Sequence, residues 1–280
     1  MIKNRKLVNI GCGKIYHEDW INYDLHPSDN NIIKCDIMNG IPLDSKTVDV
    51  VYHSNILEHL HKEKAEAFLH ECHRILKPKG IIRIAIPDLE QLCRNYLTEL
   101  EVVRKTNPSS TFKYQWAQAE LIDQMTRNTT GGVMKKLINS CDQENIDFLS
   151  RRIGIFQLKA KANTGKQNIK QQRTRTRKVL SHFKHRILSL KHIKSLIPRL
   201  SSEEKKLIEV GRFYTSGEHH KWMYDEYSLN ALLSSTGFIE TKKMEPNKSL
   251  IKKWEDYYLE VDKNKNIIKP DSIVLEGRKQ

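Results

Sequence analysis

The stretch Val8-Asn9-Ile10-Gly11-Cys12-Gly13, with Asn22-Tyr23-Asp24-Leu25 close behind it, decides how this chain folds. Apolar or β-prone residues lead into a turn with two glycines, and a second short strand then ends on an acid. Glycine tolerates positive φ and lets the backbone approach a ligand closely. A carboxylate at the tip of the next strand can accept hydrogen bonds from a ribose diol. The pattern predicts a nucleoside-containing cofactor lying across the carboxyl ends of a parallel sheet.

The identity of that cofactor depends on two further positions. A dinucleotide fingerprint has a third glycine, which would fall at position 16, but Tyr16 stands there and NAD is therefore disfavoured. Asp36 is expected at the tip of the third strand, where its carboxylate can accept a hydrogen bond from an adenine amino group. Both Asp24 and Asp36 could instead be ordinary turn-forming acids.

The order of the predicted elements indicates an α/β fold with a parallel sheet, because strands alternate with helical stretches. Residues 62–76 have helical spacing and close on Lys77-Pro78-Lys79-Gly80, a helix stop and a turn. A second helix over residues 227–233 precedes the last two strands. Runs rich in Val and Ile predict seven strands, at residues 7–10, 21–24, 32–36, 48–52, 81–86, 238–244 and 272–276.

The link between the first two strands is unusually short. Only the seven residues Lys14 to Trp20 separate the glycine turn from the second strand. A parallel crossover usually needs a dozen residues or more. We therefore expect a very reduced helix there.

The strand pattern disappears from about Leu89 to Thr215, where helical, polar and basic stretches take over. We therefore divide the chain into the first part of a cofactor-binding core at residues 1–98, a helical and basic insertion at residues 99–215, and the C-terminal part of the core at residues 216–280. The insertion is expected to lie on the acceptor side.

The net charge of +14 is concentrated in one segment. Residues 159–206 contain fifteen Lys and Arg against two acids, so the other 232 residues carry a net charge of only +1. The five cysteines are scattered without a CxxC pair, which predicts reduced cytosolic thiols and neither a zinc site nor a disulfide framework. No apolar run approaches the ~18 residues that span a bilayer, and the first residues show no signal-peptide core.

Taken in series, the motifs resemble those of class I S-adenosylmethionine-dependent methyltransferases. The series is VNIGCG, YDL, CDI, SNILEHL, RILKPKG and IRIAIPDLE, in matching order and spacing over residues 7–90. Residues 114–116, 120–127, 131–134 and the segment His220-Lys221-Trp222-Met223-Tyr224-Asp225 resemble one methyltransferase group that is common in bacterial surface-polysaccharide biosynthesis. The resemblance implies S-adenosylmethionine as cofactor and a Rossmann-like sheet of seven strands whose last strand is antiparallel.

The resemblance also implies roles for residues that follow the strands. The glycine turn faces the methionyl end of the cofactor, the acid after the second strand holds the ribose, the acid after the third borders the adenine, and residues after the fourth approach the methionyl amino group or the acceptor. In that order, the cofactor-binding residues are Gly11, Cys12 and Gly13, Asp24 and Leu25, Asp36 and Ile37, and His53 and Ser54. The alternative for His53 is packing at the start of the following helix.

Candidate catalytic residues follow from the chemistry of methyl transfer. Transfer from a sulfonium is an in-line displacement, for which an enzyme supplies mainly alignment and a dry site. An oxygen acceptor also loses a proton, which a positioned His or carboxylate can accept. We expect this base to be His59, His220 or Asp88, with His219 a weaker candidate. The alternative for each histidine is a solvent-exposed or structural role.

Four polar residues of the insertion, Glu120, Asp123, Gln124 and Arg127, recur at helical spacing and share one face of the predicted helix. A solvated helix face and a wall that binds a polyol acceptor are the two interpretations of this stripe. The sequence leaves both open.

The basic segment, residues 159–206, has three interpretations. Residues 173–178 read Arg-Thr-Arg-Thr-Arg-Lys, and an amphipathic helix that Pro198 ends is predicted after them. An anionic membrane surface fits the apolar stripe, because each Lys or Arg near such a surface gains ~1 kcal/mol. Nucleic acid fits the charge alone, since no aromatic residues interleave with the basic run. A solvated insertion is the third interpretation.

The sequence thus predicts a cytoplasmic methyltransferase, peripheral on the inner face of the membrane, that methylates a hydroxyl on a sugar of a surface glycan or its precursor. One alternative is an RNA methyltransferase that binds nucleic acid through the basic segment. Another is a non-catalytic scaffold with a methyltransferase-like fold, although a scaffold would need neither Asp24 nor Asp36.

Overall fold

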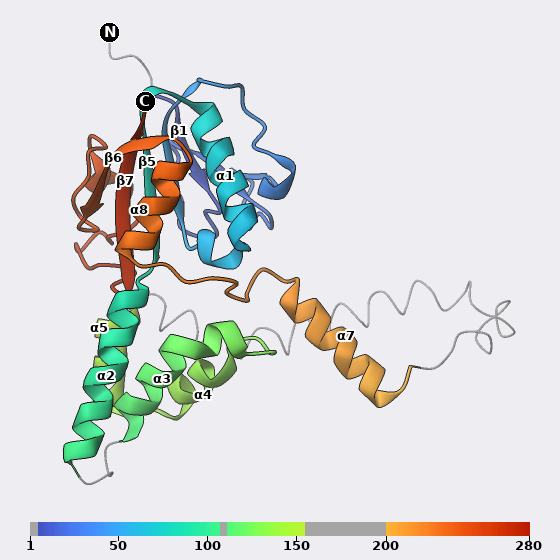
Figure 1. Ribbon diagram of the computed structural model, residues 1–280, viewed down its shortest axis with the longest axis vertical. Helices are drawn as coiled ribbons and strands as arrows, with labels where there is room; N and C mark the ends of the chain where they lie inside the picture. Colours follow the sequence, from blue (N-terminus) through green and yellow to red (C-terminus); the bar gives the residue numbers. More distant parts are fainter. Residues whose placement is uncertain (1–4, 107–110, 155–199) are drawn as a thin grey trace, which may run out of the picture.

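Seven strands form a single mixed sheet in the computed structural model, which describes residues 5–106, 111–154 and 200–280 (Figure 1). The order is β3-β2-β1-β4-β5-β7-β6, in which neighbours up to β5 pair in parallel and β7 runs antiparallel to both β5 and β6. This confirms the expected Rossmann-like sheet with its reversed last strand. The strands are β1 (Leu7–Ile10), β2 (Ile21–Asp24), β3 (Ile32–Lys34), β4 (Val48–Ser54), β5 (Leu76–Pro87), β6 (Phe238–Met244) and β7 (Ser272–Lys279).

Most strand bounds follow from where the apolar runs begin and end. β1, β2 and β6 coincide with the predicted residues, whereas β4, β5 and β7 are longer. β3 stops earlier than predicted, and Asp36 soon afterwards caps a short 3-10 helix, η1 (Ile37–Asn39). The turn predicted at residues 77–80 lies inside β5 instead. There Lys79 has a φ of 64° and the pairing with β4 is irregular.

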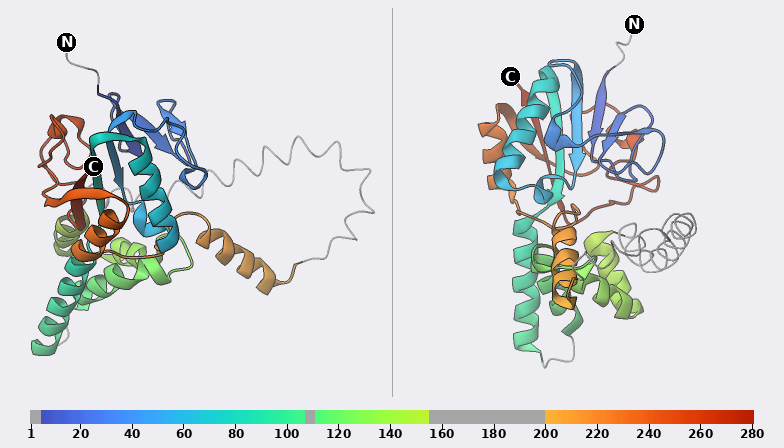
Figure 2. Two further views of the ribbon diagram at one scale, coloured as in Figure 1. Left: turned by 45° about the horizontal axis from the view of Figure 1, so that its top comes forward. Right: turned by 90° about the vertical axis from the view of Figure 1, so that its right-hand side faces the viewer.

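Two helices cover one face of the sheet. The helix predicted over residues 62–76 is confirmed as α1 (Lys62–Ile75), whose Phe68 and Cys72 are buried in the main core. The second predicted helix is α8 (Glu226–Ser235), which adds Leu229 and Leu233 to the same core. Figure 2 shows both helices on the same side of the sheet.

The reduced helix expected between β1 and β2 is wrong, because residues 11–20 form turns and bends and contain no helix. The segment 245–271 covers the face of the sheet opposite α1 and α8 in its place. Trp254 lies edge-on to Trp20 and to Tyr52, with ring centroids 6.2 and 5.1 Å apart. Aromatic side chains from far along the chain therefore supply the apolar cover that a crossover helix would give.

A buried ion cluster fastens the segment 245–271 to the sheet. Arg83 of β5 is fully buried and pairs with its cross-strand neighbour Glu276 of β7 at 2.6 Å, and also with Glu260 of the segment. Its guanidinium carbon lies 4.2 Å from the ring centroid of Trp254, the first residue of η3 (Trp254–Tyr257). Removing one member of such a cluster leaves a buried charge without its partner and typically costs about 3–5 kcal/mol.

The chain between β5 and β6 contains a separate group of helices, drawn below the sheet in Figure 1. A small apolar core around the fully buried Trp116 joins three of them, with Met134 and Leu149 among its members. The described helices of this region are α2 (Leu89–Lys105), α3 (Thr111–Thr126), α4 (Gly132–Ser140), α5 (Gln143–Ile153) and α7 (Ser202–Tyr214).

Most of the basic segment lies outside the described residues. The predicted amphipathic helix that ends at Pro198 falls there, and only residues 200–206 of the segment are described. Within the described parts of the chain, no helix combines the length and apolar character needed to cross a membrane.

Candidate active site

The glycine turn, residues 11–13, follows β1 directly at the carboxyl edge of the sheet. Gly11 and Gly13 have φ values of 63° and 56°, a left-handed conformation that glycine adopts at little cost. A Cβ on Gly11 would lie 2.0 Å from Ile56 Cδ1, whereas no described atom lies within 4 Å of a Cβ on Gly13. Gly11 is therefore packed against the chain that leaves β4, and Gly13 has open space beside it.

Asp24, the last residue of β2, has its carboxylate fixed beside the glycine turn. Its Oδ2 accepts a hydrogen bond from Gly13 N at 2.8 Å, and its Oδ1 accepts one from His26 N at 2.8 Å. Each oxygen keeps a further lone pair, so the carboxylate can still accept hydrogen bonds from a ribose diol. The side chain of the next residue, Leu25, is exposed. Asp24 thus organises the turn from the position expected of a ribose ligand.

Asp36 and Ile37 follow β3 at the same edge. The exposed Asp36 carboxylate accepts hydrogen bonds from Met38 N and Asn39 Nδ2, both at 3.0 Å, and so has the turn-forming role considered for it. Ile37 is partly buried and packs against the main core. Any contact between Asp36 and an adenine would use the lone pairs that these two bonds leave.

Two residues expected at the cofactor, Cys12 and His53, have buried side chains. Burial, together with the charge of Asp24, raises the pKa of the Cys12 thiol to about 12. The His53 ring packs edge-on against Phe68 of α1 with centroids 5.1 Å apart, and burial lowers its pKa to about 3. Because successive side chains of a strand point to opposite faces, the position of His53 on β4 turns its ring toward α1. The ring therefore has a packing role, although against the middle of α1 and not at the start of a helix as the alternative had it.

Ser54 ends β4 and connects the edge to the segment 245–271. Lys269 Nζ donates a hydrogen bond to Ser54 Oγ at 2.6 Å. The segment that replaces the expected first helix therefore also brings a lysine to the carboxyl end of β4.

Three ionisable side chains meet beyond β4, and we call Glu58, His59 and His220 the Glu58 cluster. Glu58 and His59 belong to η2 (Leu57–His59), whereas His220 arrives after the helical insertion. One oxygen or ring nitrogen from each residue lies within 4.8 Å of the other two. Glu58 Oε1 is 3.9 Å from His59 Nε2, and the two imidazole rings meet edge-on with centroids 4.7 Å apart. The structure thus brings two of the predicted base candidates together.

Backbone hydrogen bonds hold the cluster in place. Lys221 N donates to the carbonyl oxygen of Glu58 at 2.6 Å, and His220 N donates to the carbonyl oxygen of Gln124 in α3 at 3.1 Å. The segment 220–225 is therefore fixed between η2 and the insertion.

Glu58 is the member of the cluster that the sequence analysis missed. Its side chain is 1% exposed, and among the described residues neither carboxylate oxygen has a hydrogen-bond partner. Burial raises the pKa of Glu58 to about 8 and lowers the pKa of His59 to about 4. Burial also lowers the pKa of Lys269, against the opposing charges of Glu58 and Asp271. The only signal in the sequence was the place of Glu58 beside His59 in SNILEHL.

Asp88, the third base candidate, caps the start of α2. Its Oδ1 accepts hydrogen bonds from Glu90 N and Gln91 N at 3.0 and 3.3 Å. Its carboxylate is therefore engaged at a helix terminus and is not a member of the Glu58 cluster. The ring of the weaker candidate, His219, packs against Tyr214 with centroids 4.4 Å apart.

The polar stripe of α3 is buried at two of its four positions. Glu120 and Asp123 are 3% and 4% exposed. Glu120 pairs with Arg152 of α5 at 2.8 Å, and Asp123 accepts a hydrogen bond from Val133 N of α4 at 2.8 Å. The solvated-face interpretation is therefore wrong for these two residues, because they join α3 to its neighbouring helices.

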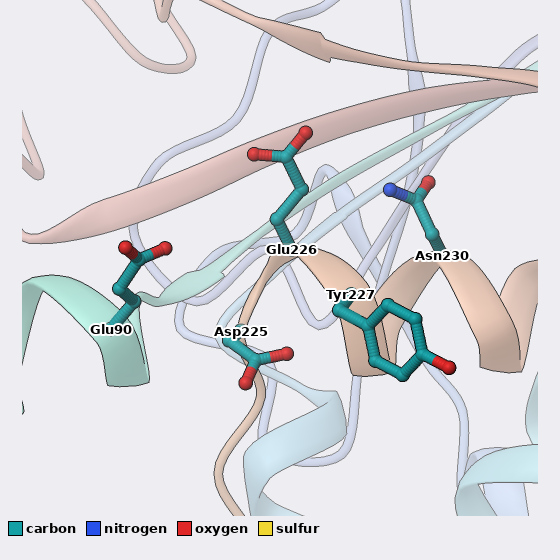
Figure 3. Close-up of a pocket in the computed structure, with 5 residues that line it drawn as sticks. All are labelled: Glu90, Asp225, Glu226, Tyr227 and Asn230. Atoms are coloured by element: carbon teal, nitrogen blue, oxygen red, sulfur yellow. The ribbon is translucent and has the colours of Figure 1, made fainter.

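A hollow of about 400 Å³ lies away from the Glu58 cluster, between the starts of α2 and α8 (Figure 3). Two of its acids are engaged in ion pairs, Glu90 with Arg94 at 2.6 Å and Glu226 with Lys243 at 3.2 Å. None of the predicted site residues lines it. The full lining is Glu90, Asp225, Glu226, Tyr227 and Asn230.

Comparison with known families agrees with this geometry. Residues 9–84, which run from β1 into β5, match a family model described as a methyltransferase domain. The glycine turn, the acids after β2 and β3, and two members of the Glu58 cluster all lie in the matched stretch. This part of the core therefore matches a methyltransferase domain, the class for which the sequence motifs predicted S-adenosylmethionine as cofactor. The search of curated proteins found no match to this chain.

The solved structures that match this chain are distant from it in sequence, and their TM-scores are low. A SAM-dependent methyltransferase from Archaeoglobus fulgidus is 12% identical and aligns over 98% of this chain and 86% of its own, with a TM-score of 0.38. One from Thermotoga maritima is 13% identical, over 98% and 82%, with a TM-score of 0.37. One from Mesorhizobium loti is 18% identical, over 30% of this chain, with a TM-score of 0.23, and the alignment spans 47% of that protein.

Proposed function

We propose that this protein transfers the methyl group of S-adenosylmethionine to a hydroxyl group, on a sugar of a surface glycan or its precursor. The observation that carries the proposal is the position of the Glu58 cluster next to the cofactor edge of a methyltransferase domain. Ile56, two residues before Glu58, fills the space above Gly11. Only the side chain of Ile56 would therefore separate the S-adenosylmethionine site from the acceptor site.

In the proposed reaction an acceptor oxygen attacks the methyl carbon in line with the carbon–sulfur bond. The carbon–oxygen bond forms as the carbon–sulfur bond breaks, and S-adenosylhomocysteine leaves with the bonding electron pair. The hydroxyl proton passes to an imidazole nitrogen of His59 or His220 in the Glu58 cluster. The rest of the site supplies alignment and excludes water, which is most of what an in-line displacement requires.

The sugar acceptor is supported by the polar surroundings of the cluster and by the motifs of residues 114–134 and 220–225. Arg127, the residue directly after α3, reaches the same region, where its guanidinium donates to the carbonyl oxygen of Glu218 at 3.1 Å. A polyol offers several hydroxyls to such donors and acceptors. We further propose that residues 159–206 hold the enzyme at an anionic membrane surface, where the basic side chains gain ~1 kcal/mol each.

The donor is tested by calorimetry with S-adenosylmethionine and with NAD. We expect binding of the first and none of the second. Asp24→Ala removes a charged hydrogen-bond acceptor, worth roughly 1.5–3 kcal/mol, so it should weaken S-adenosylmethionine binding about 10- to 100-fold. Asp44→Ala, which removes an exposed acid in the loop before β4, is the matched control and should bind like the unmodified protein. Failure to bind S-adenosylmethionine, or tighter binding of NAD, would overturn the proposal.

The acceptor is tested with methyl-labelled S-adenosylmethionine and two candidate pools, nucleotide sugars with isolated surface glycans, and total RNA. Label on a sugar hydroxyl, located by mass spectrometry, supports the proposal. Label on RNA, with binding that weakens steeply as salt rises, would replace it with the RNA methyltransferase. Binding of the donor without label on either pool would favour the scaffold.

A further inference from the structure

We propose that Glu58, His59 and His220 together bind one divalent transition-metal cation. One potential ligand atom from each residue lies within 4.8 Å of the other two. Two imidazole nitrogens and one carboxylate oxygen form a ligand set that binds zinc and several other first-row metals. The residues come from η2 and from the end of the insertion, so the cation would join two distant parts of the chain.

The buried carboxylate of Glu58 is the first independent observation that points to a cation. It is 1% exposed, and in the described part of the chain both of its oxygens lack a hydrogen-bond partner. A buried polar group without a partner is costly, and a buried charge more so. The charge of Lys269 acts on this carboxylate, and a bound cation would also give its oxygens the direct partner that they lack among the described residues.

The orientation of His59 is the second observation. Its Nδ1 lies 3.4 Å from the carbonyl oxygen of His219, a contact in which a protonated Nδ1 would donate. The lone pair of Nε2 is then free, and this atom is the one that lies 3.9 Å from Glu58 Oε1. Histidines that ligate metals usually donate their other ring N–H to a carbonyl or a carboxylate in this way.

Neighbouring charges select the kind of cation. The positive charges of Arg127, Lys221 and Lys269 act on His59, and Asp271 adds a negative charge near Glu58. Lys221 Nζ is engaged by the carbonyl oxygen of Tyr214 at 3.0 Å. These positive charges oppose the binding of every divalent cation, so only a cation that the ligand atoms themselves hold strongly is expected to bind. Imidazole ligands favour zinc, cobalt and similar ions over magnesium and calcium.

The proposed site differs from the zinc sites that the cysteine pattern excludes, because it contains no cysteine. The sequence could not indicate it, since His220 and the Glu58-His59 pair are separated by the whole insertion. The motif SNILEHL supplies two of the three ligands, and only the folded chain brings the third.

The role of the cation rests on the proposed methyl transfer, although its binding does not. Three protein ligands leave coordination positions open, as in catalytic zinc sites. A sugar hydroxyl that coordinates the cation there would have a lowered pKa and would release its proton to water. The two imidazoles would then act as ligands, and the coordinated oxygen would attack the methyl carbon.

The test is a titration of chelator-treated full-length protein with Co²⁺ in the absence of cofactor and acceptor, followed by calorimetry and by the ligand-field absorption of bound cobalt. We expect one equivalent to bind, and Zn²⁺ to displace it. Glu58→Gln and His220→Ala should each weaken binding at least about 100-fold, more than the 10–100-fold typical of an outer-shell partner. If Glu58→Gln does not fold, His59→Ala provides the same test.

An exposed pair on α1 provides matched controls, because His70 Nε2 lies 4.0 Å from Glu66 Oε1 and no third ligand joins them among the described residues. Glu66→Gln and His70→Ala should bind Co²⁺ like the unmodified protein. No binding to the unmodified protein, or equal binding by the cluster variants, would overturn the cation site. S-adenosylmethionine affinity measured on the same samples separates the two proposals, since cobalt binding without donor binding would overturn only the methyl transfer.

Discussion

The glycine turn and the Glu58 cluster lie side by side at the carboxyl edge of the sheet but are built in different ways. The turn is organised locally, because Asp24 accepts its hydrogen bonds from Gly13 and His26. The cluster is assembled from η2 and His220, which are separated by the helical insertion. The first depends on a short sequence and the second on the whole fold.

The two regions also differ in their electrostatics. The acids of the cofactor edge are partly or fully exposed, and backbone or side-chain N–H groups satisfy them. In the cluster a buried carboxylate has a pKa raised to about 8 and a neighbouring imidazole has one lowered to about 4. Under the proposed function, S-adenosylmethionine is held at an exposed site built from a local motif. The acceptor hydroxyl reacts at a desolvated site. This division is consistent with strongly perturbed pKa values gathering at functional sites.

Arg83→Leu is expected to have the largest effect on the free energy of unfolding. It should loosen the segment 245–271 while leaving the strands beside the glycine turn intact. This change leaves Glu260 and Glu276 buried without their cation and should cost about 3–5 kcal/mol of unfolding free energy in urea. The segment 245–271, which carries Lys269 to the carboxyl edge, should then exchange its amide hydrogens faster than β1 and β2. Arg94→Leu breaks an exposed pair with Glu90 and should cost no more than about 0.5 kcal/mol. A loss below about 1 kcal/mol for Arg83→Leu would contradict the anchoring role.

The sequence predicts the cofactor edge far better than the cluster, for a physical reason. Asp24 ends β2, and Gly11 and Asp36 come soon after β1 and β3, so all three lie where short strand runs meet punctuating residues. The absence of a helix between β1 and β2 could not be predicted. The segment that takes its place depends on the packing of Trp254 against Trp20, which is far away in the sequence. The burial of Glu58 could not be predicted either, since an acid beside a histidine has the same sequence whether it is solvated or enclosed.

The next largest effect tests the contact between Gly11 and Ile56, which lies two residues before Glu58. Gly11→Ala puts a Cβ 2.0 Å from Ile56 Cδ1 at a φ of 63°. Strain and overpacking together should cost about 2–4 kcal/mol. Gly13→Ala, at a similar φ of 56° but with open space in the described structure, should cost only about 1–2 kcal/mol.

The pair of glycine variants separates steric contact from backbone strain when both are measured by urea unfolding. Ile56→Ala combined with Gly11→Ala should recover the steric part of the loss and leave the strain. Equal losses of unfolding free energy for Gly11→Ala and Gly13→Ala would show that Ile56 moves aside without destabilising the protein. The cofactor edge and the cluster would then be independent of each other.

The smallest effect concerns His53, which lies between the two regions but packs against α1. Its pKa is about 3 in the folded protein and near 6.5 in the unfolded chain. Between these values the unfolded chain binds a proton that the folded protein does not, so stability falls as the pH falls from 6.5 toward 3, by up to ~1.4 kcal/mol per pH unit. His53→Leu removes this loss.

Urea unfolding at about pH 7 and about pH 5 should therefore show a smaller difference for His53→Leu than for the unmodified protein, by roughly 2 kcal/mol. At neutral pH the variant should be at least as stable, because neither ring nitrogen of His53 has a hydrogen-bond partner among the described residues. His70→Leu, on the exposed surface of α1, controls for the loss of a solvated imidazole. An unchanged pH dependence in His53→Leu would mean that the ring is reached by solvent from the cofactor edge. His53 would then belong to the solvated cofactor edge and not to the desolvated interior.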